Sequence, residues 1–324
     1  MKILNFDIHS FDDVPKALLR ETAEIIDIKT PSDLDTKLCA DVVAVVCRFG
    51  TRLDGSILAK MPALKAIATI TTGTDHIDTE FCLKKGIEIL SLKGEHSFLS
   101  EIHATPELTW GLLLSLIRHI PPAFERAKEG YWERAPFFGH ELYGKTIAIL
   151  GMGRVGKIVG RYAHAFGMEI LGVNDNDVSE LDYPFVLCSL EKALEQGDVV
   201  SLHLPLNPST HHFIRKEHFE IMKKSAVFIN TARGALVDES ALLGALRENK
   251  IAGAALDVLE DETSGSGIAK MHPLIQYASE NNNLVITPHI AGMTFESMEK
   301  TNVFMANKLR DFLENGKSSK SDCV

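Results

Sequence analysis

The sequence predicts an α/β protein with two parallel-sheet domains, and two observations carry that prediction. The chain has 324 residues, which is more than the roughly 100–150 residues of a typical single domain. Short runs rich in isoleucine and valine also alternate with helical patterns along most of its length. Strands buried on both faces have this composition, and helices between consecutive strands imply a parallel sheet.

The first hundred residues contain five such runs, and a long helical stretch follows them. Strands are expected at residues 2–6, 23–28, 42–47, 65–70 and 87–90. The helical stretch covers residues 105–120, and Pro121 and Pro122 are expected to stop it because proline lacks the amide donor that a helix interior needs. Its central part, residues 108–117, is apolar nearly all round, as in a helix buried on two sides. Residues 129–143 contain aromatic residues, proline and glycine, and they predict a connector.

A second α/β series begins after this connector. Helical patterns at residues 155–165, 191–196 and 240–248 lie between its strands. An amphipathic stretch at residues 296–314 comes last, before a polar tail rich in serine and lysine. The strands of this series are expected at residues 146–150, 169–173, 199–203, 226–230, 252–258 and 284–287.

Composition and charge limit the classes of function. Apolar residues make up 45% of the chain, and the net charge of −10 provides no overall positive field for a nucleic acid or an anionic membrane. The start of the chain lacks the pattern of a signal peptide, and the most apolar stretch has about half of the ~20 residues that span a bilayer. We therefore expect a cytoplasmic protein. The cysteines are scattered and form no C-x-x-C pair, so they predict neither a disulfide framework nor a metal site; they are Cys39, Cys47, Cys82, Cys188 and Cys323.

A strand, a glycine-rich turn and a helix follow one another within residues 146–165. Gly151, Gly153 and Gly156 form the pattern G-x-G-x-x-G between the strand and the helix. Such glycines allow a tight turn and let the backbone approach a pyrophosphate at the helix N-terminus. Asp175 ends the next strand about 20 residues further on, where an acidic side chain binds both ribose hydroxyls. Because a carboxylate there repels a 2′-phosphate, the pattern predicts a dinucleotide-binding domain that prefers NAD to NADP.

Further motifs extend along the chain in a fixed order. They include Thr-Gly-Thr-Asp-His-Ile-Asp at residues 72–78, Asn-Thr-Ala-Arg-Gly at 230–234 and Thr-Pro-His-Ile-Ala-Gly at 287–292. In this order they resemble the D-isomer-specific 2-hydroxyacid dehydrogenases. The resemblance implies a Rossmann dinucleotide-binding domain at residues 105–290, inserted into a flavodoxin-like α/β substrate domain formed by residues 1–104 and 291–324. It also implies an active site between the domains and a homodimer joined near residues 109–117.

The same resemblance implies an NAD-dependent oxidoreductase that interconverts a D-2-hydroxy acid and its 2-keto acid. The family's catalytic arginine, glutamate and histidine match Arg233, Glu262 and His289. The planar fork of an arginine suits bidentate binding of a carboxylate. An imidazole, with an ordinary pKa of about 6.5, suits proton exchange with the carbonyl oxygen. Glu262 would stabilise the imidazolium, and Glu260 stays open as an alternative partner.

Other roles follow from the resemblance alone. Arg48 and the backbone of Thr72 and Gly73 would bind the substrate, although an exposed arginine and a plain glycine turn remain open interpretations of these positions. The remaining matched residues would contact the NAD: Thr105, Gly151, Gly153, Arg154, Val155, Gly156, Asp175, Pro205, Thr231, Ala232 and Asp257.

Two alternative functions stay open. An NAD(H)-sensing interaction protein, like the corepressor branch of the same family, keeps the same arginine, glutamate and histidine. A formate dehydrogenase-like enzyme would carry glutamine where Glu262 stands. The chain also departs from the family pattern at Thr263, where proline is usual, at Asn207, where threonine is common, and in residues 93–103, a longer stretch than usual.

Overall fold

The computed structural model describes residues 1–7, 11–178, 181–260, 262 and 271–316. Thr263 and Cys323, both named above, lie outside these residues. The chain divides into two compact units. Unit 1 contains Met1–Ile102 and the C-terminal stretch that begins at Thr294, and unit 2 contains His103–Glu262 and the stretch that ends at Met293.

Unit 1 is built on a five-stranded sheet, with strand order β2-β1-β3-β4-β5. Every pair of neighbouring strands is parallel, as the alternation of strands and helices predicts. The central strand is buried at all six positions, which explains its unbroken apolar sequence Val-Val-Ala-Val-Val-Cys. The strands are β1 (Lys2–Asn5), β2 (Glu24–Asp27), β3 (Val42–Cys47), β4 (Ala66–Thr69) and β5 (Glu88–Leu90).

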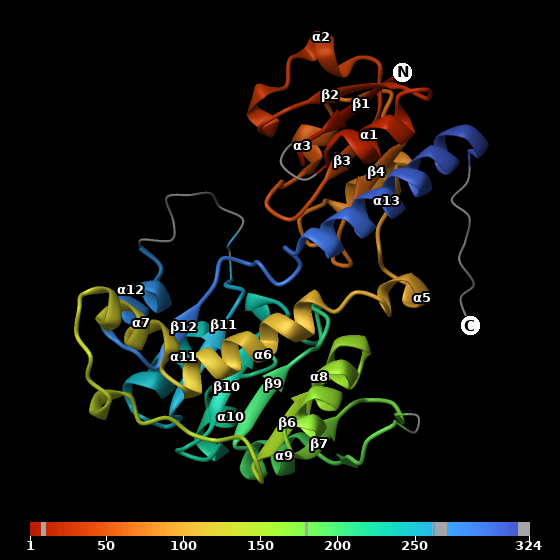
Figure 1. Ribbon diagram of the computed structural model, residues 1–324. Coiled ribbons are helices and arrows are strands. Elements are labelled where there is room, and N and C mark those ends of the chain that lie inside the picture. The colour runs from red at the N-terminus through yellow and green to blue at the C-terminus, as the bar shows by residue number, and fades with distance from the viewer. Residues whose placement is uncertain (8–10, 179–180, 261, 263–270, 317–324) are drawn as a thin grey trace. The chain divides into compact units, whose positions relative to one another are not determined.

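Helices cover both faces of this sheet. On one face α1 (Asp13–Leu19) and α13 (Phe295–Asn315) lie side by side (Figure 1). Met305, Ala306 and Leu309 of α13 pack there against Ile3, so α13 completes the core around β1. The short helices α2 (Thr36–Cys39), α3 (Gly55–Leu58) and α4 (Thr79–Lys85) contribute to the core on the other face, and α5 (His96–Leu99) and a 3₁₀ turn at Pro31–Asp33 complete the unit.

Unit 2 is built on a seven-stranded parallel sheet, with order β12-β11-β10-β9-β6-β7-β8. The chain runs outward from β6 to β7 and β8 and then returns to β9, which pairs with the other side of β6. Connections therefore leave β6 and β9 in opposite directions, and ligands of open α/β sheets bind at such a switch point, outside the carboxyl ends of the strands. The strands are β6 (Thr146–Leu150), β7 (Glu169–Val173), β8 (Val186–Leu187), β9 (Val199–Leu202), β10 (Val227–Asn230), β11 (Gly253–Leu256) and β12 (Leu284–Ile286).

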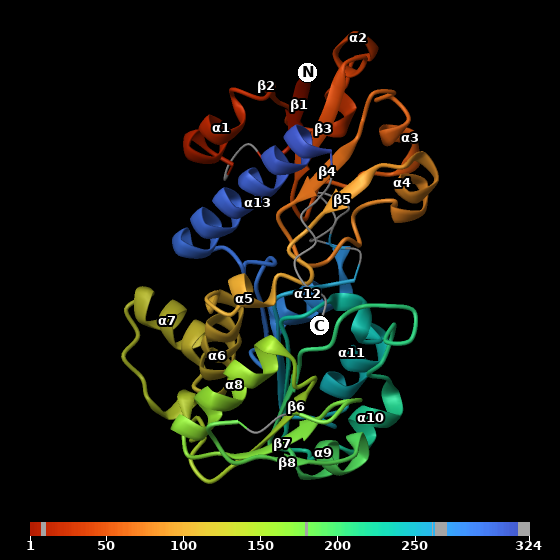
Figure 2. The same cartoon turned by 90° about the vertical axis from the view of Figure 1, so that its right-hand side faces the viewer.

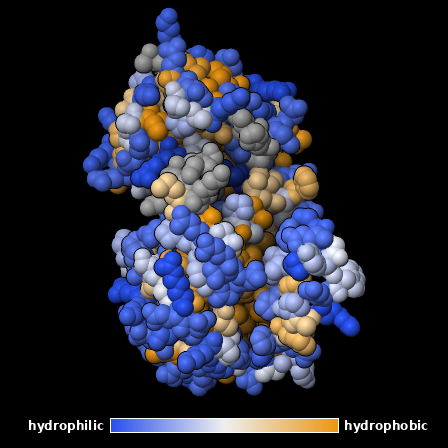
Figure 3. All heavy atoms as spheres, turned by 90° about the vertical axis from the view of Figure 1, so that its left-hand side faces the viewer, coloured by the Kyte–Doolittle hydropathy of each residue, from blue (hydrophilic) through white to orange (hydrophobic). Residues whose placement is uncertain are grey.

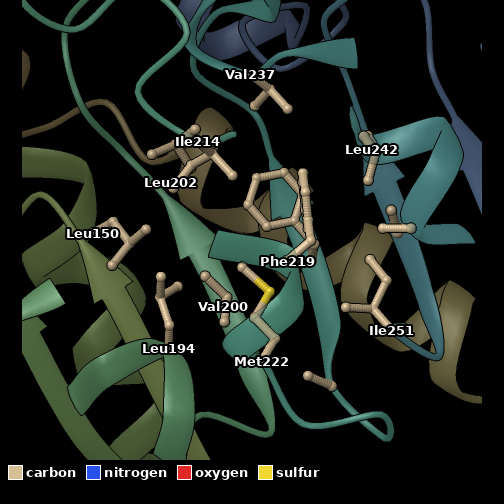
Figure 4. Packing of buried hydrophobic residues seen from close by; sticks show 14 of the residues in the cluster. Leu150, Leu194, Val200, Leu202, Ile214, Phe219, Met222, Val237, Leu242 and Ile251 are labelled. Carbon is tan, nitrogen blue, oxygen red and sulfur yellow. The ribbon is translucent and has the colours of Figure 1, made fainter. Parts of the chain in front are cut away.

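Two helical layers enclose the second sheet (Figure 2). Helices α6 (Ala104–Ile117) and α8 (Arg154–Ala165) pack in the core of one face. The other face carries α9 (Leu190–Gln196), α10 (Lys216–Ile221), α11 (Glu239–Arg247) and α12 (Pro273–Glu280). Figure 4 shows how Phe219 and Met222 pack with Val200 and Leu202 in this second core. The two cores hold the parallel strands, and hence their carboxyl ends, in a fixed order.

The region around Pro121 and Pro122 differs from the prediction. Helix α6 ends at Ile117, and a new helix, α7 (Ile120–Lys128), contains both prolines in its first turn. His119 separates the two helices with a left-handed φ of 51°. Proline is tolerated in a first turn because those amides have no partner within the helix. The prolines therefore begin α7 as well as preventing the continuation of α6. The connector, with a 3₁₀ turn at Ala135–Phe137, starts only after α7.

Most apolar side chains of α6 are buried within unit 2 itself, with Trp110 and Leu113 only 5% and 1% exposed. Large exposed apolar side chains follow in the next segment, and Trp132 is 91% exposed. On the face drawn in Figure 3 the surface is mostly hydrophilic, with smaller hydrophobic groups between. Within the described part of the chain, no helix combines the length and the apolar composition needed to cross a membrane.

Candidate active site

Three predicted catalytic residues follow three neighbouring strands of unit 2. Arg233 comes after β10, Glu262 after β11 and His289 after β12, and these strands are adjacent in the sheet. Because the strands are parallel, their carboxyl ends share one edge. The sheet order thus gathers at that edge residues that are far apart in the sequence.

Glu262 and His289 are in direct contact. The Oε1 atom of Glu262 lies 2.6 Å from Nδ1 of His289, and its Oε2 accepts the amide hydrogen of Leu259 at 3.2 Å. The two side chains are 20% and 26% exposed, respectively. The contact fixes the orientation of the imidazole and directs its Nε2 away from the carboxylate. Such a pair can stabilise a protonated imidazole and present a proton at Nε2.

A left-handed loop carries the histidine. His289 has a φ of 53°, which is uncommon for a residue with a side chain, and its amide donates to the carbonyl oxygens of Asp257 at 2.8 Å and Thr287 at 3.0 Å. This backbone conformation is held in place by the carboxylate of Asp257. Its Oδ1 accepts from the Thr287 hydroxyl at 2.6 Å and the Ile290 amide at 2.9 Å, and its Oδ2 accepts from the Ala291 amide at 2.8 Å.

Asp257 is fully buried, and burial raises the pKa of its carboxyl above the ordinary value even though three donors stabilise the ionised form. The resemblance assigns this residue to the NAD. The structure shows a second use that the sequence does not reveal, since Asp257 binds the chain on both sides of His289. The sequence carries only a weak signal for this second use: the amides of Ile290 and Ala291, directly after His289, need an acceptor.

Arg233 projects from a tight turn after β10. The Asn230 side chain closes this turn, because its Nδ2 donates to the Arg233 carbonyl at 2.9 Å and its Oδ1 accepts from the Ala232 amide at 2.9 Å. Gly234 lies against the chain that leads to Glu262, so closely that a Cβ there would be 2.0 Å from the carbonyl carbon of Leu259. Glycine is required at that position, and it brings the arginine turn next to the segment that carries Glu262.

The three glycines of the predicted turn have different surroundings. Gly151 has a φ of 102°, and a Cβ on it would be 2.7 Å from the His203 carbonyl oxygen. A Cβ on Gly156 would be 2.1 Å from the Gly151 carbonyl oxygen, whereas a Cβ on Gly153 would meet no described atom within 4 Å. Two glycines therefore allow chain packing, and the third leaves open space at the N-terminus of α8. That arrangement fits a pyrophosphate.

The ribose end of the predicted NAD site lies after β7. Asp175 is exposed there. The preceding residue, Asn174, was not among the predicted site residues, yet it orders the turn: its Oδ1 accepts from the Met152 amide at 3.1 Å and its Nδ2 donates to the Asn176 carbonyl at 2.9 Å. Asn174 therefore ties the glycine turn to the strand that presents Asp175.

The other predicted NAD contacts lie near the same strand ends. Thr231 follows β10, and its hydroxyl lies 2.8 Å from that of Thr109. The Thr109 hydroxyl donates to the Thr105 carbonyl at 2.9 Å, so it accepts from Thr231. Thr109 was not predicted, and it joins two residues that were. Three other members of this set are half-buried, Ala232 after β10 and Arg154 and Val155 at the start of α8, whereas Pro205 after β9 is exposed.

Two ionisable groups beside these residues have pKa values displaced by burial. Burial lowers the pKa of the Arg154 guanidinium. Desolvation of the His203 imidazole, whose Nε2 lies 2.8 Å from the Ser201 hydroxyl, lowers its pKa to about 3. His203 is therefore neutral at physiological pH.

The predicted substrate residues of unit 1 make contacts within that unit. Thr72 is exposed and Gly73 accepts a hydrogen bond from the Thr71 hydroxyl at 2.6 Å. The Arg48 side chain is 17% exposed and binds Asp7 Oδ2 through Nε at 2.9 Å. Its Nη1 and Nη2 donate to the Ile70 carbonyl at 3.1 Å and to Asn302 Oδ1 at 2.7 Å. Arg48 thus ties the end of β3 to α13, a structural role that accompanies any role in substrate binding.

Residues 110–291 match the family described as D-isomer specific 2-hydroxyacid dehydrogenase, NAD binding domain. The chain belongs to the D-isomer-specific 2-hydroxyacid dehydrogenases. It is therefore an NAD-dependent enzyme of the 2-hydroxyacid dehydrogenase and reductase family, with an NAD-binding domain in the region of the glycine turn.

Curated relatives within this dehydrogenase family carry several names. A glyoxylate reductase of Thermofilum pendens is 37% identical over 276 residues, which cover 83% of this chain and 78% of that protein. A hydroxypyruvate reductase of Thermotoga maritima is 33% identical over 290 residues, covering 90% and 91%. A D-3-phosphoglycerate dehydrogenase of Methanocaldococcus jannaschii is 36% identical over 276 residues, and this match spans 84% of the chain but only 50% of that protein.

Solved structures of similar proteins have the same fold. A D-lactate dehydrogenase from Aquifex aeolicus, complexed with NAD and lactic acid, superposes with a TM-score of 0.85 at 29% identity over all of both chains. An acyclic imino acid reductase in complex with NADPH and D-Arg gives a TM-score of 0.81 at 26% identity, again over all of both chains. The α/β fold with two parallel sheets is thereby confirmed.

Proposed function

We propose that this dehydrogenase interconverts a small D-2-hydroxy acid and its 2-keto acid, with Arg233, Glu262 and His289 as the catalytic residues. The observation that carries the proposal is the 2.6 Å contact between Glu262 and His289. It occurs at the strand edge that also presents Arg233. A carboxylate, an imidazole and a guanidinium are together what the reduction of a 2-keto acid requires beyond a hydride donor.

Each side chain has a separate task. Arg233 binds the substrate carboxylate through its fork and orients the neighbouring carbonyl. In reduction, His289 gives the proton from Nε2 to the carbonyl oxygen as C2 receives the hydride, and in oxidation it accepts the hydroxyl proton as the hydride leaves. Glu262 stabilises the imidazolium form and keeps the ring oriented. When bound, the nicotinamide supplies the hydride or accepts it.

The NAD would be held along the carboxyl ends of β6, β7, β9 and β10. The open space at Gly153 and the N-terminus of α8 receive the pyrophosphate, with Arg154 and Val155 beside it. Asp175 binds the ribose hydroxyls and repels a 2′-phosphate, so NAD is preferred to NADP. The remaining contacts in this proposal come from Thr105, Pro205, Thr231, Ala232 and Asp257.

For the substrate we propose the class of small 2-keto acids. The names of the glyoxylate and hydroxypyruvate reductases among the relatives support this class. The backbone of Thr72 and Gly73 would bind the substrate carboxylate from the substrate domain, residues 1–104 and 291–324. Arg48, held by Asp7 and Asn302, would bind a distal group of the substrate. The NAD-binding domain would comprise residues 105–290.

A panel of 2-keto acids tests the proposal. Glyoxylate, pyruvate, hydroxypyruvate, phosphohydroxypyruvate and bulky aliphatic and aromatic 2-keto acids are each mixed with enzyme and NADH or NADPH, and the nicotinamide absorbance is followed. We expect turnover with at least one small 2-keto acid and faster turnover with NADH. NADH binding without turnover of any 2-keto acid would contradict the proposal and favour a sensing protein, whereas reduction of NAD by formate would favour the formate dehydrogenase alternative.

We also propose that the dehydrogenase is a homodimer. Most apolar side chains of α6 are already buried within their own chain, so the apolar side chains of the following segment are the better candidates for contact with a second copy. Phe124, Trp132, Phe138 and Tyr143 are 60%, 91%, 84% and 82% exposed, an unusual concentration of exposed aromatic surface. Light scattering at micromolar concentration should give twice the chain mass, and Trp132→Glu should release monomers. A monomer mass for the natural chain would contradict the proposal.

A further inference from the structure

A compact group of metal-binding side chains lies beside the proposed catalytic pair. His211 and His212 come from the connection between β9 and α10, and Glu260 follows β11. The ligand atoms of the three side chains all lie within 4.8 Å of one another. Neither the proposed reaction nor the predicted NAD contacts use these residues.

The two imidazoles face the same carboxylate. Nε2 of His212 lies 3.1 Å from Oε1 and 3.0 Å from Oε2 of Glu260, and Nε2 of His211 lies 3.5 Å from Oε1. The rings are stacked, with centroids 4.0 Å apart and planes inclined by 27°. Neighbouring residues in a chain usually direct their side chains apart. Here both direct the same ring nitrogen to one point.

Contacts that involve no metal hold the backbone at each of the three positions. His212 has a left-handed φ of 48°, its amide donates to the Ala235 carbonyl at 2.8 Å, and its carbonyl accepts from Nε of Arg215 at 2.8 Å. The His211 amide donates to the Asn207 carbonyl at 3.0 Å. The Glu260 amide donates to Oε1 of Glu239 at 2.8 Å.

Glu239 is itself held, because its Oε2 pairs with Nε2 of His272 at 3.0 Å. The backbone that carries the three ligands is therefore held by contacts that do not depend on an ion, and the side chains meet through the Glu260 carboxylate. The exposed fractions of the His211, His212 and Glu260 side chains are 52%, 35% and 31%, which leaves a route for an ion from solvent.

We propose that His211, His212 and Glu260 bind a divalent transition-metal ion, with zinc as the best match. Two neutral imidazoles and one carboxylate are ligands that zinc accepts, at about 2.0–2.2 Å from the metal, and a tetrahedral site then places ligand atoms roughly 3.3 Å apart. The separations of 3.0–3.5 Å between the Nε2 atoms and the Glu260 carboxylate oxygens lie close to that spacing. The protein supplies three ligands, and a water or a small anion takes the fourth position.

The ion would act on the segment that carries the proposed catalytic glutamate. Glu260 lies two residues before Glu262, and the Leu259 amide that precedes it donates to Glu262 at 3.2 Å. Fixing the Glu260 carboxylate between two histidines would restrict this segment and hence the Glu262–His289 contact. This consequence rests on the proposed function, whereas ion binding itself does not.

Direct binding tests the proposal. The untagged full-length chain is freed of metal with a chelator and dialysed, and zinc is then titrated against a chromogenic chelator. Cobalt(II) is used in parallel, since a tetrahedral site gives it a strong visible absorption. We expect one tight equivalent of either ion. Glu260→Gln and His211→Gln should each weaken binding by at least about 100-fold, because loss of an outer-shell partner alone costs about 10–100-fold.

His164→Gln is the matched control, since His164 is an exposed histidine elsewhere in unit 2. It should bind zinc as the natural chain does, and circular dichroism should show that all three variants are folded. Equal affinity in the natural chain and in Glu260→Gln, or no saturable binding by the natural chain, would overturn the proposal. Glu262→Gln separates the two proposals, because it should lower turnover and leave zinc binding unchanged.

Discussion

The two halves of the seven-stranded sheet present their functional groups by different means. At the ends of β6 and β7 the backbone itself would form the proposed NAD site, through glycines whose packing leaves no room for a side chain at positions 151 and 156. At the ends of β10, β11 and β12 side chains would form the proposed catalytic site, and other side chains position them, as Asn230 does for the Arg233 turn and Asp257 for the His289 loop. The first arrangement depends on the packing of backbone against backbone, and the second depends on contacts between side chains and the chain around them.

The largest expected effect is on turnover, and it distinguishes the catalytic half of the sheet from the NAD-binding half. His289→Ala should reduce turnover by roughly 10²–10⁴-fold, the usual range for a lost general acid, while NADH affinity stays close to that of the natural enzyme. Steady-state kinetics and an NADH fluorescence titration measure the two quantities. A parallel loss of NADH affinity would show that the two ends are not independent, and His164→Ala is the control.

A glycine pair tests the backbone half. In Gly156→Ala the new methyl group would lie 2.1 Å from the Gly151 carbonyl oxygen, so we expect destabilisation of about 1–3 kcal/mol from overpacking. Gly153→Ala meets no described atom within 4 Å and should leave thermal unfolding nearly unchanged, yet weaken NADH, because the methyl group occupies space left for the pyrophosphate. Thermal unfolding with and without NADH distinguishes the two. Equal destabilisation by both variants would contradict this assignment of roles.

Asp257→Asn tests the side-chain half. The asparagine amide would place donor hydrogens against the donors that now bind the carboxylate, which costs about 1–3 kcal/mol for an unsatisfied buried group. The resulting shift of the His289 loop should lower kcat by up to ~10²-fold, since a misplacement of about 1 Å has that effect. Unfolding and steady-state kinetics measure both effects. An unchanged kcat would refute the role of Asp257 in positioning the His289 loop. An additional loss of NADH affinity would support the further role of Asp257 as a contact of the NAD.

Asp175→Ala tests the ribose end of the backbone half. Loss of hydrogen bonds to a charged acceptor, worth about 1.5–3 kcal/mol, should weaken NADH by roughly 10–100-fold, and the loss of negative charge should narrow the gap between NADH and NADPH. Michaelis constants for both cofactors report the change. If the natural enzyme uses the two cofactors equally, the role assigned to Asp175 is wrong.

The smallest expected effect concerns acid stability. His203 has a pKa of about 3 in the folded chain and about 6.5 when unfolded, so only the unfolded chain gains a proton as the pH falls below about 6.5. The contribution of His203 to the free energy of unfolding is thus complete above that pH and is lost progressively toward pH ~3. At pH ~5 this loss amounts to about 2 kcal/mol. His203→Gln should remove this loss when urea unfolding is compared at neutral and acid pH. An identical pH response in variant and natural chain would contradict it.

Much of the fold and part of the site could be predicted from the sequence because their signals are local. The Ile- and Val-rich runs predicted the strands of both parallel sheets, and the comparisons confirm that fold. Gly151, Gly153 and Gly156 lie between one strand and one helix, so their spacing alone predicted the turn that the structure shows. Pro121 and Pro122 were also a local signal, but this signal was ambiguous. Proline is unfavourable in the interior of a helix and favourable in the first turn of one, so the same two residues could end one helix or begin another.

Only the tertiary structure decided which distant side chains meet. The family spacing favoured Glu262 as the partner of His289 and kept Glu260 as the alternative, and the fold places Glu262 on His289 and Glu260 on His212. The links from Asp257 to the His289 loop and from Arg48 to Asn302 likewise join residues that are far apart in the sequence. The sequence by itself determined the two sheets, the glycine turn and the residue types available for chemistry. Their pairing depended on strand order and helix packing, because contacts between distant residues are set by the geometry of the whole core and leave no periodic pattern in the chain.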